Sequence, residues 1–116
     1  MRLKLIIAMV ADEKTDTVIE AAREAGATGS TIITNVRGEG LNPEKTFLGL
    51  ELGAQRDFIL FIVAEPLARE ILETICAAAK FDEEPGSGIA FQLDIEDVVG
   101  LKTQQETIIQ EIEDTL

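Results

Sequence analysis

Hydrophobic residues along the first third of the chain follow two different periods. Leu3 to Val10 is a nearly continuous apolar run, too short for a helix and typical of a strand that is covered on both faces. From Asp12 to Ala25 the apolar residues recur at helical spacing, and Gly26 follows where a helix would end. Ser30 to Val36 returns to β-branched residues. The pattern therefore predicts a strand, a helix and a second strand.

The same unit recurs 53 residues later, where Ile59 to Ala64 repeats the apolar run Ile6 to Ala11. A second amphipathic helix follows this run, and Gly88 to Leu93 supplies a fourth strand. The order βαββαβ predicts an α+β, ferredoxin-like sandwich, in which a four-stranded antiparallel sheet carries both helices on one face. Gln104 to Leu116 reads as a short amphipathic helix. We expect one domain that spans residues 1–116.

Such a sheet has one face that the helices do not cover. Strands as apolar as these are unsuited to a wet face, because a large exposed apolar patch promotes aggregation. Association of several copies through their sheets is the simplest way to cover it. The sequence therefore predicts an oligomer.

Composition narrows the range of functions. The chain has 22 acidic and 10 basic residues and a net charge of −12, which disfavours binding to nucleic acid and to anionic membrane surfaces. No apolar run approaches the length of about 20 residues that spans a bilayer, and the N-terminus has no cleavage-site pattern, so we expect a cytoplasmic protein. The absence of His and the single Cys76 make most catalytic triads and zinc sites impossible. We therefore expect a protein that is not an enzyme.

Two long segments interrupt the repeat, at Arg37 to Gln55 and at Lys80 to Gly88. Gly86-Ser87-Gly88 is either a backbone nest for phosphate or a simple turn before a strand. The acidic residues at 82–84 are either hard-cation ligands or, more commonly, a solvated charge run. Cys76 fits a buried thiol better than a nucleophile. These two segments are the candidate functional regions.

Several of these motifs, in this order, resemble the nitrogen regulatory PII signal-transduction family. Val36-Arg37-Gly38-Glu39-Gly40 resembles the opening of the family's long T-loop, and residues 26–32 resemble the segment before its second strand. The helix that ends at Lys80, followed by Gly86-Ser87-Gly88, resembles the approach to its B-loop. The similarity covers most of residues 3–103. We assign residues 37–55 as T-loop-like, 80–88 as B-loop-like and 100–116 as the C-terminal segment.

The resemblance implies a homotrimer that binds an adenine nucleotide (ADP, AMP or ATP) in clefts between subunits. It also implies a long loop that regulates a target protein, such as a membrane transporter or an enzyme, without inserting into the membrane. Apolar residues in that loop suit a docking surface. Carried over to this sequence, the nucleotide-binding residues would be Thr28, Arg37, Gly38, Gly40, Gly86, Ser87, Gly88, Lys102 and Thr103.

The sequence departs from the family pattern at the phosphates. Ile89 and Gly100 stand where the family has basic residues, so one cation of three remains, close to the acidic run at 82–84. Each lost charged hydrogen bond is worth about 1.5–3 kcal/mol, so we expect weaker binding of ATP relative to ADP and AMP. The chain also has no Tyr, which makes modification of a T-loop tyrosine impossible. This pattern indicates a divergent PII-like protein.

Two other classes stay open. A CutA-like trimeric metal-binding protein has the same topology, although only carboxylates are left here as ligands. A small carboxylate enzyme would need a paired acid and base, for which the sequence offers no pattern. No metal site and no required cofactor is predicted.

Overall fold

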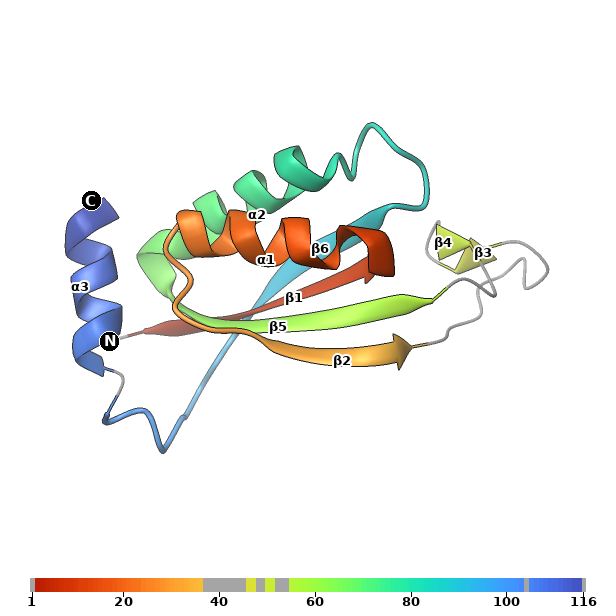
Figure 1. The fold of residues 1–116 in the computed structure, drawn as a ribbon. Coiled ribbons are helices and arrows are strands. Elements are labelled where there is room, and N and C mark those ends of the chain that lie inside the picture. Colours follow the sequence, from red (N-terminus) through yellow and green to blue (C-terminus); the bar gives the residue numbers. More distant parts are fainter. Residues whose placement is uncertain (1, 37–45, 48–49, 52–54, 104, 116) are drawn as a thin grey trace.

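The computed structural model describes residues 2–36, 46–47, 50–51, 55–103 and 105–115 of the chain. Two βαβ halves follow one another, and a short strand pair and a C-terminal helix are added to them (Figure 1). The elements are β1 (Leu3–Ala11), η1 (Asp12–Lys14, a 3₁₀ turn), α1 (Thr15–Glu24), β2 (Thr31–Val36), β3 (Thr46–Phe47), β4 (Leu50–Glu51), β5 (Arg56–Ala64), α2 (Glu65–Ala79), β6 (Gly88–Asp94) and α3 (Gln105–Thr115).

The main sheet has the strand order β2-β5-β1-β6, and every neighbouring pair is antiparallel. The two central strands, β1 and β5, are the two long apolar runs of the repeat. Ile7 in the middle of β1 lies opposite Leu60 of β5 and Phe91 of β6. Helices α1 and α2 lie side by side over one face of this sheet (Figure 1). The predicted ferredoxin-like α+β fold is confirmed.

The hydrophobic core lies between this sheet and the two helices. Alternate residues of β1 and β5 point toward the helices because successive side chains of a strand face opposite ways. Helix α2 buries one stripe in return and has Pro66 in its first turn, where a missing N–H costs nothing. The core contains Ile6, Ala8, Val10, Val18, Ala22, Ile59, Phe61, Val63, Leu67, Ile71 and Ile75.

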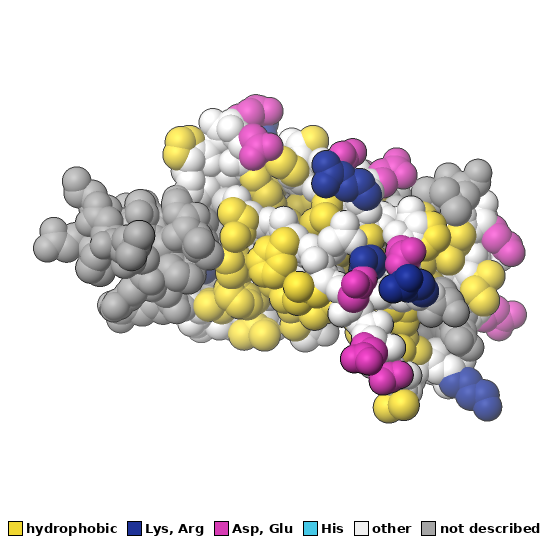
Figure 2. Space-filling model, turned by 180° about the vertical axis from the view of Figure 1, so that it is seen from behind, with side chains coloured by type: hydrophobic (Ala, Val, Ile, Leu, Met, Phe, Trp, Pro, Cys, Tyr) yellow, Lys and Arg dark blue, Asp and Glu magenta, His cyan; other side chains and the backbone are white. Residues whose placement is uncertain are grey.

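The opposite face of the sheet, which we call the open face, is also apolar. By the register of the strands it carries Leu5, Ile7, Met9, Ile33, Phe58, Leu60, Ile62, Ile89, Phe91 and Leu93. In the single chain Ile33, Ile62, Phe91 and Leu93 are 38–48% exposed. Figure 2 shows the molecule from behind, where hydrophobic side chains form a broad patch. Four exposed large apolar residues on one face are typical of a surface that a partner covers.

Three details differ from the sequence-based prediction. The first helix begins at Thr15 because residues 12–14 form a 3₁₀ turn. The long loop contains a short antiparallel strand pair, β3 with β4, which alternation over so few residues cannot reveal. Cys76, expected to be buried, is only partly buried.

Helix α3 packs on its own chain. Ile108 is buried, and Ile112 lies against the main core. Among the residues that the structure describes, no helix is long and apolar enough to cross a membrane.

Candidate functional site

The B-loop-like segment, Lys80 to Gly88, is held by its own backbone. Lys80 ends helix α2 in the left-handed conformation, with φ of 57°, and its carbonyl accepts from the amides of Glu83 and Glu84 at 3.2 and 2.9 Å. Two successive amides bonded to one carbonyl form a compact turn. The backbone of this segment is therefore held by hydrogen bonds within the segment itself.

Ser87 closes this turn. Its hydroxyl is 2.7 Å from the carbonyl oxygen of Glu84 and 3.3 Å from that of Lys80, and its amide also donates to Glu84, at 3.2 Å. Its carbonyl accepts from Ala11 at 3.0 Å, and the residue is 5% exposed. A hydroxyl has one proton to donate, and the Ser87 hydroxyl donates it within its own loop. Any phosphate contact in this motif would then use the flanking glycines.

Gly88 lies against the core where β6 begins. A Cβ added there would be 2.6 Å from the ring carbon Cε1 of Phe81 and 2.8 Å from the backbone oxygen of Met9. Separations that short force the backbone to move. Only glycine fits at this position.

Replacing Gly88 with alanine should therefore lower the free energy of unfolding by about 1–3 kcal/mol, as overpacking does elsewhere. Chemical denaturation followed by circular dichroism measures this. The matched control is Gly29→Ala, because nothing lies within 4 Å of a Cβ built at Gly29. Equal stability of the two variants would contradict the close approach at Gly88.

The charges around this loop are mostly negative. Asp82, Glu83 and Glu84 are exposed, as a solvated charge run should be. Glu84 accepts from Lys14 of η1, with Oε2 2.7 Å from Nζ. The hydrogen bond from Lys14, and then its charge, lower the pKa of Glu84 from the ordinary value of a glutamate. The loop is thus tied to the start of α1, and Lys14 is a cation at the loop that the sequence prediction missed.

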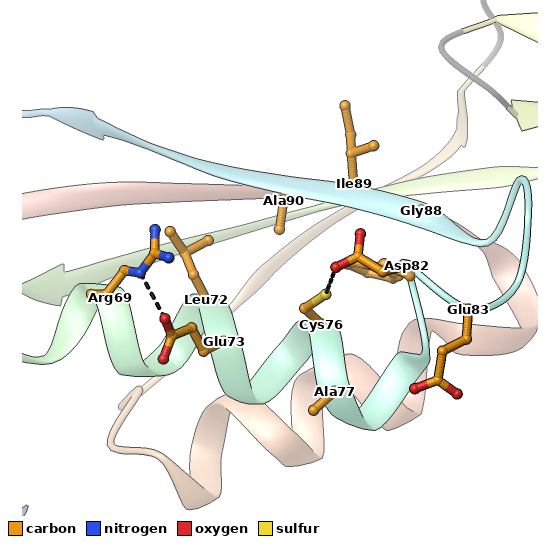
Figure 3. Close-up of a pocket in the computed structure, with 11 residues that line it drawn as sticks. Arg69, Leu72, Glu73, Cys76, Ala77, Asp82, Glu83, Gly88, Ile89 and Ala90 are labelled. Carbon is orange, nitrogen blue, oxygen red and sulfur yellow. Dashed lines mark hydrogen bonds and ion pairs between the residues drawn. The ribbon is translucent and has the colours of Figure 1, made fainter.

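A groove of about 660 Å³ runs between α2 and β6, next to this loop (Figure 3). Arg69 pairs with Glu73 at one end, at 2.9 Å. At the other end the thiol of Cys76 donates to Asp82, at 3.3 Å. Burial, and then the bond to Asp82, raise the pKa of the Cys76 thiol, so the thiolate is disfavoured. Of the predicted binding residues that the structure describes, only Gly88 lines this groove.

Thr28 lies elsewhere, in a hollow of about 390 Å³ at the start of β2. The hollow lies against the open face, because Leu5, Leu60 and Ile62 form part of its wall, and Leu101 closes it from the C-terminal segment. Lys102 lines an adjoining hollow that also includes Leu101. Thr28 and Lys102 therefore belong to one region of the molecule.

The predicted site residues thus fall into two groups within one chain. Loop 80–87 precedes β6, and residues 100–103 follow it. A strand of seven residues spans about 20 Å, and Figure 1 has the two groups at opposite ends of the sheet. The structure brings Thr28 into the same region as Lys102, which Thr103 follows in the chain, and this region lies away from Gly86, Ser87 and Gly88. Arg37, Gly38 and Gly40 lie outside the described residues.

One polar contact, between the start of α1 and the start of β5, was not predicted from the sequence. The hydroxyl of Thr15 donates to Asp57 at 2.5 Å, and both residues are buried. Asp57 follows Arg56 at the start of a strand whose remaining residues are apolar, and a buried charge in such a strand is the signal in the sequence that indicates a special role. The contact ties the start of α1 to the start of β5.

Metal ligands form no cluster in the described ranges. Within residues 2–36, 46–47, 50–51, 55–103 and 105–115, no group of three or more carboxylates and thiols lies close enough together to hold a metal ion. The acidic run at 82–84 lies within these ranges.

Comparison with known proteins gives a consistent result. The family model for nitrogen regulatory protein P-II matches residues 3–105. Among solved structures, CPII from Thiomonas intermedia K12, bound to ADP, AMP and acetate, is similar with a TM-score of 0.69 and 24% identity, over 86% of this chain and 91% of CPII. CPII bound to ADP and bicarbonate matches with a TM-score of 0.61 and 25% identity, over 82% and 87% of the two chains. A PII-like signalling protein from Thermus thermophilus matches with a TM-score of 0.61 and 24% identity, over 82% and 88%. Since the family model matches 103 consecutive residues of the 116, the chain belongs to the nitrogen regulatory protein P-II family.

Proposed function

We propose that the protein is a trimeric, non-enzymatic regulator that binds an adenine nucleotide between subunits. The observation that carries this proposal is the division of the predicted binding residues into two groups at opposite ends of the sheet. A single chain cannot close a site from groups about 20 Å apart, whereas two neighbouring chains can supply one group each. Thr28, Lys102 and Thr103 would come from one subunit, and the T-loop base with Gly86, Ser87 and Gly88 from the next.

The open face supports the trimer. Its exposed apolar side chains would be buried if three sheets faced a common axis, and each square ångström of apolar surface removed from water contributes roughly 25 cal/mol. A closed ring also ends the association, because no apolar sheet face is left over. The domain, residues 1–116, would then be one subunit of a cytoplasmic assembly.

The nucleotide is proposed from the family and from the charge of the site. CPII is bound to ADP and AMP in its solved structures. In this chain Ile89 and Gly100 leave few cations for phosphates, and the acids at 82–84 repel them. We therefore propose ADP or AMP as the effector in preference to ATP.

Segment 37–55 would be the part of the protein that responds to the effector and regulates a target protein, such as a transporter or an enzyme. We call it the output segment. An effector changes such a segment only by binding its two states with different affinity. Its four glycines raise the entropy that must be given up on ordering, and its leucines could offset that cost by burial against a target. The pairing of β3 with β4 supports a segment that can take up an ordered state.

We predict that ADP slows amide exchange across residues 38–53 in the trimer, because ordering of the segment protects its amides. Hydrogen exchange with and without ADP tests this. Adenosine, which has no phosphate, is the control ligand and should leave the segment unchanged. An exchange pattern that is identical with and without saturating ADP would contradict the proposal that this segment responds to the nucleotide.

The metal-binding alternative has no support from the described residues, where no cluster of ligands is present.

A further inference from the structure

The segment Ala11–Thr15, which we call the junction, contacts both candidate functional regions. The amide of Ala11 donates to Ser87 in the B-loop-like segment, at 3.0 Å. The next amide, Asp12, donates to Gln55 at the end of the long loop, at 3.3 Å. Two consecutive amides thus hold two loops that are far apart in the sequence.

Two side chains of the junction repeat this arrangement. Lys14 binds Glu84 of the B-loop-like segment at 2.7 Å, and its side chain is 17% exposed. The hydroxyl of Thr15 donates to the carboxylate of Asp57, just beyond the end of the long loop, at 2.5 Å. Among the described residues, each loop therefore contacts the junction through both backbone and side-chain hydrogen bonds.

The junction is short and its contacts are costly to lose. Residues 12–14 form a single 3₁₀ turn that leads directly into α1, so this segment has little slack between the two loops. Asp57 is 8% exposed. Loss of its hydrogen bond would destabilise the protein, because the bond compensates for the removal of the carboxylate from water. When either loop shifts, a movement of the whole junction therefore costs less free energy than breaking one of these contacts.

We propose that the junction couples the B-loop-like segment to the end of the long loop at Gln55–Asp57, with Lys14 and Thr15 as positioning residues. This inference rests on the proposed function, because it supplies a route within one chain from an effector at 86–88 to the output segment. Coupling of this kind requires an element whose position both sites bias, and the junction has contacts to both.

Amide exchange of Ala11 and Asp12 in the free trimer tests the coupling, since each amide reports one of the two loops. Thr15→Val removes the hydroxyl that holds Asp57. It should raise exchange at Asp12 and also at Ala11, whose own partner is untouched, by about fivefold, the factor that corresponds to one hydrogen bond. Glu84→Gln weakens the opposite contact and should raise exchange at both amides by about twofold, as expected for an exposed ion pair.

Matched controls separate coupling from general loosening. Thr15→Ser keeps the hydroxyl and should restore wild-type exchange at both amides. Glu83→Gln removes the same charge from the neighbouring position and should leave both amides unchanged. Should Thr15→Val fail to fold, Glu84→Gln decides the outcome, because Glu84 is exposed. The proposal is overturned if each substitution affects only the amide that faces its own loop.

The same samples with ADP keep the two proposals apart. In the wild type ADP should slow exchange at both amides, and in Thr15→Val at Ala11 alone. If both amides respond together to the substitutions but ADP has no effect, the coupling stands and the nucleotide proposal fails.

Discussion

Replacing Ile7 with glutamate should convert the trimer into a folded monomer. Ile7 lies at the centre of the open face, between Leu60 and Phe91. In a monomer the new carboxylate would face water at little cost. In a trimer three carboxylates would be buried together in an apolar interface, which costs several kcal/mol each by desolvation (about 2–7 kcal/mol even for an uncharged polar group) and adds mutual repulsion.

Light scattering measures the result directly. The wild type should have three times the mass of the 12.6 kDa chain, and Ile7→Glu the mass of one chain with an unchanged circular dichroism spectrum. The matched control is Ile32→Glu, because Ile32 pairs with the core residue Ile59 and so lies on the helix side of edge strand β2. This variant should stay trimeric. A wild type that is monomeric at micromolar concentration, or an Ile7→Glu variant that remains a trimer, would contradict the proposed assembly.

The second large effect concerns the choice of nucleotide. ADP and AMP should bind at least as tightly as ATP, because each further phosphate brings negative charge to a site that keeps one of the family's three cations and lies near three acids. Ile89→Lys restores a basic residue at the family's position. Because Ile89 also lies on the open face, light scattering must first show that this variant stays trimeric. ATP binding by the trimeric variant should then strengthen by about tenfold or more, the worth of one charged hydrogen bond. Lys102→Ala should weaken all three nucleotides by a similar factor.

Calorimetric titration of the three nucleotides into each variant provides the measurement. Arg69→Ala is the charge-matched control for Lys102→Ala, because Arg69 is an exposed base that pairs with Glu73 on α2, and it should leave all affinities unchanged. Submicromolar binding of ATP by the wild type, with AMP giving no heat, would show that this interpretation of Ile89 and Gly100 is wrong.

The fold was predictable because the hydrophobic patterns of its strands and helices are long and occur twice in the chain. Two apolar runs of similar length became the central strands β1 and β5, and two helical stripes became α1 and α2. The uncovered apolar face followed from the same pattern, since helices on one side of a four-stranded sheet leave the other side bare. The strand pair β3–β4 was missed, because two residues in each strand carry no detectable period.

The site was predictable only as a set of residues. The resemblance supplied Thr28, Lys102 and Gly86-Ser87-Gly88, but the spacing of residues along a chain does not say which of them meet. Three-dimensional packing groups Thr28 with the C-terminal segment and turns the Ser87 hydroxyl onto its own loop. Asp57 carried a signal in the sequence, a charge at the edge of an apolar strand, whereas its partner Thr15 carried none. Contacts between distant segments depend on register and packing, which pattern analysis leaves undetermined.

The most direct test of the central claim, a nucleotide site shared between subunits, is an equilibrium titration of ADP into the wild type and into the Ile7→Glu variant at equal chain concentration. The two proteins would have every proposed binding residue in common and differ in assembly. We predict saturation of the wild type at about one ADP per chain and no measurable binding by the folded monomer. Binding of ADP by the monomer with the affinity of the wild type would contradict the claim.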